Sequence, residues 1–153
     1  MSVIHIRVYG LPAPQGSKTS YGGRRMVESC KNVRPWRADV VSASQAAYKG
    51  PLLEGAVSVS VVFLFARPKS HYGVKGLLSK APEHLTSQKL GDIDKLCRST
   101  CDGLSAGAGG VLLRDDSQIV GLSAQKRYCV RDERPGAIIT VMLHSAADAQ
   151  RIA

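Results

Sequence analysis

Long hydrophobic runs are missing from this sequence. No apolar stretch approaches the ~20 residues that a helix needs to cross a bilayer. The N-terminal residues 1–8 alternate between apolar and polar side chains, a pattern that is typical of a strand and not of a signal peptide. The sequence therefore predicts a protein without membrane association and with a cytoplasmic location.

Closely paired cysteines are absent as well. The four cysteines are Cys30, Cys97, Cys101 and Cys129, and no two of them form a CxxC pair. A zinc site therefore has little support. Cys97 and Cys101 are four residues apart, which places them on one face of a helix, and we expect buried free thiols.

Acidic residues are scarce, because 12 Asp and Glu stand against 21 Lys and Arg, for a net charge of +9. Residues 1–50 carry +6 and residues 51–100 carry +3, whereas residues 101–153 are neutral. Such an excess favours polyanionic partners, and nucleic acid comes first among them. A basic protein without such a partner is the alternative, and charge alone does not decide between the two.

Hydrophobic patterning predicts an α+β fold in a single domain, residues 1–153. We expect strands at 4–9, 55–66 and 137–143, one or two strands within 111–128, and helices at 34–49 and 92–104. The almost continuous apolar run at 55–66 is typical of a central strand. Together these elements predict a mixed sheet of about four strands with two helices, followed by a frayed helical tail from residue 145.

Two long loops, residues 11–33 and 67–91, separate the expected elements. Loops of this length inside a compact domain are usually functional or disordered. Both are rich in Lys and Arg, and the second contains a single acid, Glu83. Basic side chains bind the phosphate backbone of DNA. Our candidates for this contact are Lys18, Arg24, Arg25, Lys69 and Lys75.

Five of the twelve acids lie between Asp92 and Asp116. Singly, each has an ordinary explanation: Asp92 as a helix N-cap, Asp94 in a surface ladder with Arg98 and Asp102, and Asp116 in a turn. Carboxylates that converge repel each other unless a cation neutralises them, and Mg²⁺ binds one or two carboxylates with water and phosphate. Acids between basic loops therefore predict metal-dependent phosphodiester cleavage.

The acidic region resembles the signature of the RusA-like Holliday junction resolvases, which are common in phages and prophages. The motifs that carry the resemblance are Gly91–Arg98 with its Asp-x-Asp pattern, Cys101–Leu104 and Arg114–Val120. Further likeness lies in Gly10–Lys18 and Arg67–Tyr72, so that the resemblance covers about residues 4–143.

This resemblance implies a symmetric homodimer that nicks two strands of a four-way DNA junction with Mg²⁺ or Mn²⁺. It implies a role in DNA recombination and repair, in a bacterial or phage-infected cell. By position, Asp92, Asp94 and Asp116 would be the catalytic metal ligands, with Asp115 ranked below them. Arg98 stands where the family often has a catalytic lysine. We assign it to phosphate binding because arginine does not readily exchange a proton. The alternative function is a non-catalytic basic DNA-binding module.

Overall fold

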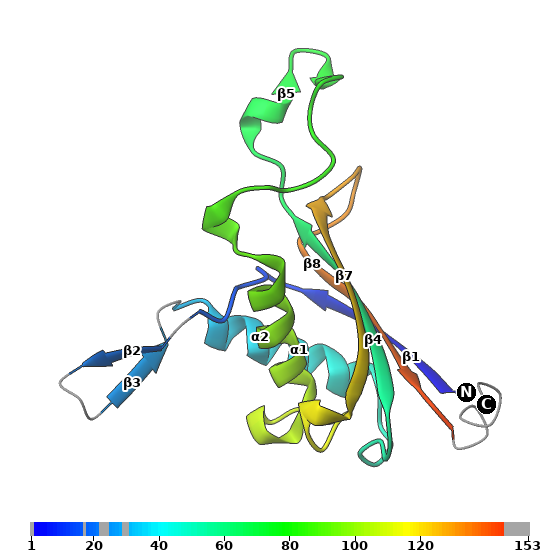
Figure 1. Cartoon of the computed structure of the whole chain (residues 1–153). Coiled ribbons are helices and arrows are strands. Elements are labelled where there is room, and N and C mark those ends of the chain that lie inside the picture. Colours follow the sequence, from blue (N-terminus) through cyan, green and yellow to red (C-terminus); the bar gives the residue numbers. More distant parts are fainter. Residues whose placement is uncertain (1, 17, 22–24, 29–30, 146–153) are drawn as a thin grey trace.

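Four strands form one mixed sheet, and two helices lie against one of its faces (Figure 1). The computed structural model describes residues 2–16, 18–21, 25–28 and 31–145. The strands of this sheet are β1 (Ser2–Tyr9), β4 (Val57–Phe65), β7 (Ile119–Tyr128) and β8 (Gly136–Leu143). The helices are α1 (Val33–Ala47) and α2 (Ile93–Leu104). This arrangement confirms the predicted α+β fold with a mixed sheet of four strands and two helices.

The strands follow the order β1-β8-β4-β7 across the sheet. Strand β8 runs antiparallel to β1 and β4, whereas β4 and β7 are parallel. The prediction of a central strand at 55–66 is confirmed, because β4 pairs with a neighbour on each side. Alternate residues of β4 face the helices and are at most 2% exposed: Val57, Val59, Val61 and Phe63.

The other face of the sheet is not covered by either helix. In β1, the buried side chains Ile6 and Val8 point toward the helices, so the alternating Arg7 and Tyr9 point to the opposite side. We call this second side the open face.

The two helices approach each other closely at Gly103 of α2. A Cβ atom added there would lie 2.9 Å from the Cβ of Val40 on α1, so a larger residue would force the helices apart. The buried Trp36 of α1 donates its indole N–H to Thr100 Oγ1 of α2 at 3.0 Å. This bond satisfies the indole N–H, which would otherwise be left unpaired in the core, while the Thr100 hydroxyl also donates to the Leu96 carbonyl at 2.8 Å.

The apolar stripe predicted for residues 93–104 does face the core. Leu96 and Leu104 are fully buried, and the thiols of Cys97 and Cys101 are buried beside them. The described cysteines, at positions 97, 101 and 129, are buried free thiols, which confirms the prediction for these three. Cys30 lies outside the described residues.

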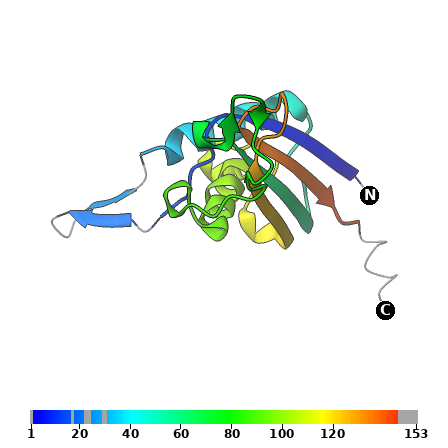
Figure 2. The same cartoon turned by 90° about the horizontal axis from the view of Figure 1, so that it is seen from above.

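Both expected loops contain short regular elements. Residues 11–33, predicted to be irregular, include the hairpin of β2 (Lys18–Tyr21) and β3 (Arg25–Glu28), which projects away from the helices (Figure 2). Residues 67–91 contain β5 (Tyr72–Gly73) and β6 (Gly76–Leu77), together with two 3₁₀ turns. We call residues 67–91 the arm, because much of this segment extends beyond the end of the sheet (Figure 1).

The prediction of strands across residues 111–128 is only partly correct. Strand β7 begins at Ile119, and the preceding segment holds isolated bridges at Leu113 and the 3₁₀ turn η4 (Asp116–Gln118). Residues 106–110 fold back onto the end of α2, where the Gly110 amide donates to the Ser105 carbonyl at 2.9 Å. The segment between the two acidic motifs is thereby tied to α2.

The predicted strand at residues 4–9 is confirmed and begins slightly earlier, at Ser2. Residues 146–153, for which we expect a frayed helical end, lie outside the described residues. In the described part of the chain, no helix has both the length and the apolar character needed to cross a membrane.

Candidate active site

A tight turn just before α2 determines where Asp92 lies. Gly91 has a φ of +106°, and a Cβ there would come within 2.6 Å of Pro14, so the position requires glycine. The Gly91 carbonyl accepts a hydrogen bond from Lys126 Nζ of β7 at 3.0 Å. Asp92 follows as the N-cap residue, with extended backbone.

The carboxylate of Asp92 does not cap the helix that it precedes. Its side chain accepts no cap hydrogen bond, although an N-cap carboxylate normally accepts one from the N2 or N3 amide. The side chain is 63% exposed, and its Oδ2 lies 3.5 Å from Lys95 Nζ. Asp92 therefore occupies the N-cap position, as the helix-cap explanation expects, but it does not form the side-chain hydrogen bond of a cap. An exposed ion pair of this kind adds little stability, and it leaves carboxylate oxygen accessible to a ligand.

Asp94 and Arg98 lie one helical turn apart on the exposed side of α2. Within the described residues, neither side chain forms a hydrogen bond or an ion pair, so the expected ladder is not made. Asp102, the third member of that ladder, lies 3.9 Å from Arg37 of α1 instead. The Arg98 guanidinium thus keeps its donors for a ligand, and its planar fork matches the geometry of a phosphate.

An open cavity of about 500 Å³ lies between α2 and β7 beside these residues. Asp94, Arg98 and the thiols of Cys97 and Cys101 line it from α2, and Leu122 and Ala124 line it from β7. Burial, and then the charge of Asp94, raises the pKa of the Cys97 thiol. Burial also raises the pKa of Cys101 to about 12, with smaller contributions from Cys97, Asp116 and Asp102. Both thiols are protonated at neutral pH, and neither acts as a thiolate nucleophile there.

Asp115 is occupied by a structural role at the start of η4. Its Oδ1 accepts the Ser117 amide at 2.9 Å, and the Gln118 side chain accepts the Asp115 amide in return, which completes a capping box. These hydrogen bonds from Ser117 lower the pKa of Asp115. The side chain of the neighbouring Asp116 forms no hydrogen bond or ion pair with any described residue. This difference supports ranking Asp116 above Asp115 as a ligand.

The carboxylates fall into two groups along α2. Asp92 and Asp94 lie at its start, whereas Asp116 lies near its end, where its charge acts on Cys101. A cavity of about 290 Å³ at this end is lined by charged residues of several elements: Arg37, Asp102, Arg114, Asp115 and Asp116. Asp94 and Asp102 are eight residues apart, which corresponds to about 12 Å along a helix axis.

The metal ion implied by the resemblance requires oxygen ligands in one place. The two groups of carboxylates offer suitable donor atoms, because Mg²⁺ and Mn²⁺ prefer carboxylate oxygen as a ligand. Among the residues that the structure describes, no group of three or more His, Cys, Asp or Glu side chains is placed to hold a metal. Mg²⁺ often takes only one or two protein carboxylates and completes its shell with water and substrate phosphate. The chain offers partial ligand sets and not a preformed cage.

The predicted DNA contacts are spread over the arm and the hairpin. Lys69 and Lys75 are exposed on the arm. The backbones of Lys18 and Arg25 belong to β2 and β3, but their side chains lie outside what the structure describes, as does the whole of Arg24. The structure therefore places two of the five candidate side chains on the surface and does not address the other three.

Two residues that the sequence reasoning did not connect with the site lie close to it. Asp102 is interpreted from sequence as a helix-stabilising residue, yet it lines the same cavity as Asp115 and Asp116. Lys126 reaches the turn before α2 from β7. The eight-residue spacing from Asp94 to Asp102 places both on one side of a helix, and this signal could have linked Asp102 to the site. The role of Lys126 depends on its contact with Gly91, 35 positions away, which no local pattern reveals.

A family model described as "Endodeoxyribonuclease RusA" matches residues 10–142. No curated protein shows significant similarity to the chain. The matched range contains α2, η4 and β7, and with them both groups of carboxylates. Because the match extends over most of the chain, the protein belongs to the RusA family of endodeoxyribonucleases.

Proposed function

We propose that the protein is a metal-dependent endodeoxyribonuclease that resolves four-way or other branched DNA by paired nicks, in DNA recombination and repair. The observation that carries this proposal is the family match over residues 10–142. The exposed and largely unengaged carboxylates on and beside α2, in a chain with a net charge of +9, support the same function. We keep the cytoplasm of a bacterial or phage-infected cell as the proposed location.

We propose Mg²⁺, or Mn²⁺, as the cofactor. Asp92, Asp94 and Asp116 would be its protein ligands and Asp115 a secondary one, with water and DNA phosphate completing the shell. The bound ion would supply Lewis-acid activation for hydrolysis of a phosphodiester, leaving a 5′-phosphate and a 3′-hydroxyl. Because the two carboxylate groups lie toward opposite ends of α2, the DNA phosphate is an essential part of this site.

The remaining functional residues act on the DNA itself. Arg98 is placed beside Asp94 in the cavity between α2 and β7 and would hold the phosphate and stabilise its charge in the transition state. Lys69 and Lys75 on the arm would contact the DNA backbone, and so would the three basic residues of the hairpin region: Lys18, Arg24 and Arg25.

Paired nicks require two active sites, and a four-way junction has approximate two-fold symmetry. A symmetric homodimer presents two identical sites related by such an axis. We therefore propose that the protein acts as a homodimer. Its mass in solution, by light scattering with and without junction DNA, is the direct measurement of this part of the proposal.

A non-catalytic DNA-binding module is the second candidate function. One observation favours it: within the described residues, no three potential metal ligands are placed around one point. In that case the exposed acids would oppose DNA binding, and replacing one of them would strengthen it. The same experiment therefore separates the two candidates.

The test uses a synthetic four-way junction labelled on each strand, with Mg²⁺ or with EDTA. We expect symmetric nicks from the wild type with Mg²⁺ only, and loss of at least about 100-fold in cleavage by Asp94→Asn, with junction binding retained. Glu83→Gln, which removes an exposed acid from the arm, is the matched control and should cleave normally. Absence of metal-dependent cleavage of junction, fork and duplex by the wild type would contradict the nuclease.

A further inference from the structure

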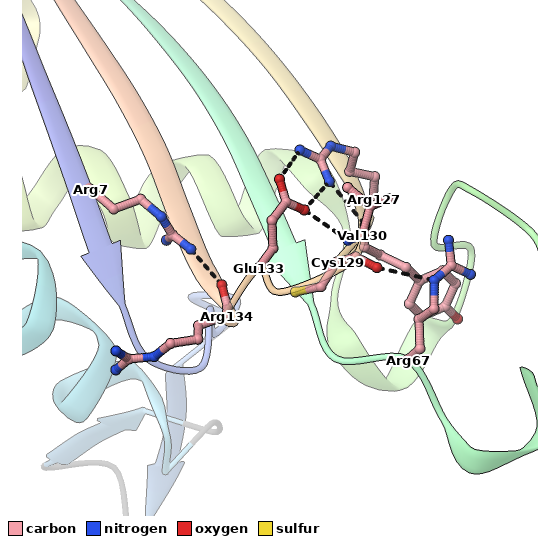
Figure 3. Close-up of polar contacts among 8 residues, drawn as sticks. Arg7, Arg67, Arg127, Cys129, Val130, Glu133 and Arg134 are labelled. Carbon is pink, nitrogen blue, oxygen red and sulfur yellow. Dashed lines mark hydrogen bonds and ion pairs between the residues drawn. The ribbon is translucent and has the colours of Figure 1, made fainter. Parts of the chain in front are cut away.

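The loop that follows β7, residues 129–135, is held in one conformation by an ion pair (Figure 3). Arg127 binds Glu133 with both terminal nitrogens, at 2.6 and 2.8 Å. Glu133 also accepts the Val130 amide at 2.8 Å. A two-pronged bond between arginine and carboxylate fixes both direction and distance, so this contact determines the path of the loop.

Two arginines from other elements anchor the ends of the same loop (Figure 3). Arg67, at the base of the arm, donates to the Cys129 carbonyl at 3.1 Å and to the Pro82 carbonyl at 2.7 Å. Arg7 of β1 donates to the Arg134 carbonyl at 2.5 Å. The loop is therefore joined to β1, to β7 and to the arm.

The loop itself contains two arginines, Arg131 and Arg134, whose side chains do not hold it in place. Among the described residues, the guanidinium groups of Arg131 and Arg134 form no hydrogen bond or ion pair. Arg131 has a φ of +50°, a conformation that non-glycine residues adopt rarely and that here points to a constraint imposed by the loop. Arg134 lies over the ring of Tyr9, with its guanidinium carbon 4.2 Å from the ring centroid.

These side chains border an open cavity of about 480 Å³ at the end of the sheet. Three arginines line it, and Arg7 lies 4.4 Å from the same Tyr9 ring. Of the two acids in the lining, Glu133 is neutralised by Arg127, so Asp132 alone opposes the three positive charges. Stacking on an aromatic ring fixes the plane of a guanidinium and leaves its N–H edge for an anion.

The geometry points to a DNA phosphate site formed by Arg131 and by Arg134, which lies over the Tyr9 ring. This inference rests on the proposed function, which makes branched DNA the ligand. The loop backbone is held in place before DNA binds, so little backbone entropy is lost when the two arginines contact a phosphate.

The position of this site identifies which part of the substrate it would bind. Tyr9 belongs to the open face of the sheet, whereas α2 with Asp94 lies on the other side. A straight duplex bound at the carboxylates leaves the open face free. A branched substrate sends arms in several directions, and an arm that is not being cut can reach the loop. The site therefore favours branched over linear DNA.

The test compares affinities for a four-way junction and for a linear duplex of equal length, in EDTA so that no cleavage occurs. For the double variant Arg131→Gln and Arg134→Gln, we expect the junction Kd to rise about tenfold and the salt slope to fall by about 1, since each phosphate that the protein neutralises contributes about 0.9. The duplex Kd should change less than about twofold. The matched control, Arg34→Gln with Lys49→Gln, removes the same charge from exposed positions near the ends of α1.

Three results would overturn the inference: an unchanged junction Kd, an equal loss of duplex affinity, or an equal loss in the α1 control. A thermal unfolding curve of each variant checks that the exposed substitutions leave the fold intact. Failure of DNA as the ligand has a different signature, because the unaltered protein would then bind neither the junction nor the duplex. Loss of cleavage alone would contradict the nuclease and leave this binding comparison valid.

Discussion

Lys126 of β7 donates a hydrogen bond to the carbonyl oxygen of Gly91 at 3.0 Å, directly before Asp92. The same turn packs against Pro14, and the segment after Pro14 runs along α2, where the Gln15 amide donates to the Lys95 carbonyl at 3.0 Å. The start of α2 is thus held between the sheet and the chain that leaves β1. Asp92 owes its position to these contacts and not to a cap of its own.

Replacing Lys126 by methionine should loosen this turn while preserving the length of the side chain. We expect a loss of about 1 kcal/mol in the free energy of unfolding, because one hydrogen bond with a charged donor disappears. Cleavage of junction DNA should fall further than stability alone explains, since Asp92 follows the turn. Urea unfolding and cleavage rates measure the two effects.

Lys80→Met is the control for this substitution, because Lys80 is an exposed lysine on the arm and the change in charge is the same. It should leave the unfolding free energy within about 0.5 kcal/mol of the wild type. A Lys126→Met protein that cleaves normally would show that the contact with Gly91 does not position Asp92.

Adjacent acids at 115 and 116 should respond differently to substitution. Asp115→Ala removes the acceptor of the Ser117 amide and breaks the capping box, so we expect a lower urea midpoint and a weakened η4 turn. Asp116→Asn removes no hydrogen bond, so its urea midpoint should remain that of the wild type while metal-dependent cleavage is lost.

Each variant is a control for the other, because both remove one negative charge from adjacent positions of the same turn. Unfolding and cleavage must be measured on both proteins. If Asp115→Ala abolished cleavage at full stability and Asp116→Asn did not, the order of the two ligands would be reversed.

Local patterns in the sequence were sufficient for much of the fold. The apolar run of β4 and the helical spacing from Ile93 to Leu104 each reflect a period that burial imposes on one element. These patterns predict the fold class, the central strand and the second helix. Each of these features requires only that one side of an element be apolar and face the core.

The missed features depend on contacts between distant residues. Residues 18–28 carry no apolar alternation, so the β2–β3 hairpin has no such signature, and β7 starts only at Ile119 because the preceding segment pairs at isolated positions. The assignment of Asp92, Asp94 and Asp116 to one site came from spacing and resemblance. Their distribution along α2 is set by how residues 105–118 fold back, which spacing does not encode.

Cys101 should be unreactive in the folded protein. Burial raises its pKa to about 12, and the nearby Cys97, Asp116 and Asp102 add to the shift. A raised pKa lowers the thiolate fraction at any given pH, and the thiolate is the reactive form. At pH 8 we expect iodoacetamide to leave Cys101 unmodified in native protein and to modify it in urea, as measured by mass spectrometry of peptides.

The substitution Asp116→Asn provides the control for the cause of this shift. Because burial is the largest cause and the carboxylates are minor ones, Cys101 should stay unreactive in this variant. Rapid labelling of Cys101 in the native wild type would contradict its burial on the side of α2 that faces β7. Rapid labelling in the variant alone would show that charge, and not burial, dominates.

The ion pair of Arg127 and Glu133 should give the protein a stability that disappears in acid. The hydrogen bonds from Arg127 lower the pKa of Glu133 from 4.5 to about 2. A carboxyl group with a lower pKa in the folded state than in the unfolded chain contributes stability above about pH 5, and this contribution is lost as the pH falls toward 2. Glu133→Gln should therefore lower the urea midpoint at pH 7 but much less at pH 2.

Asp132→Asn is the control, because it removes an exposed neighbouring carboxylate that has no arginine partner among the described residues. Its difference in urea midpoint from the wild type should be the same at pH 7 and at pH 2. An equal gap between the wild type and Glu133→Gln at both pH values would mean that the side chain stabilises the loop by packing and not by charge.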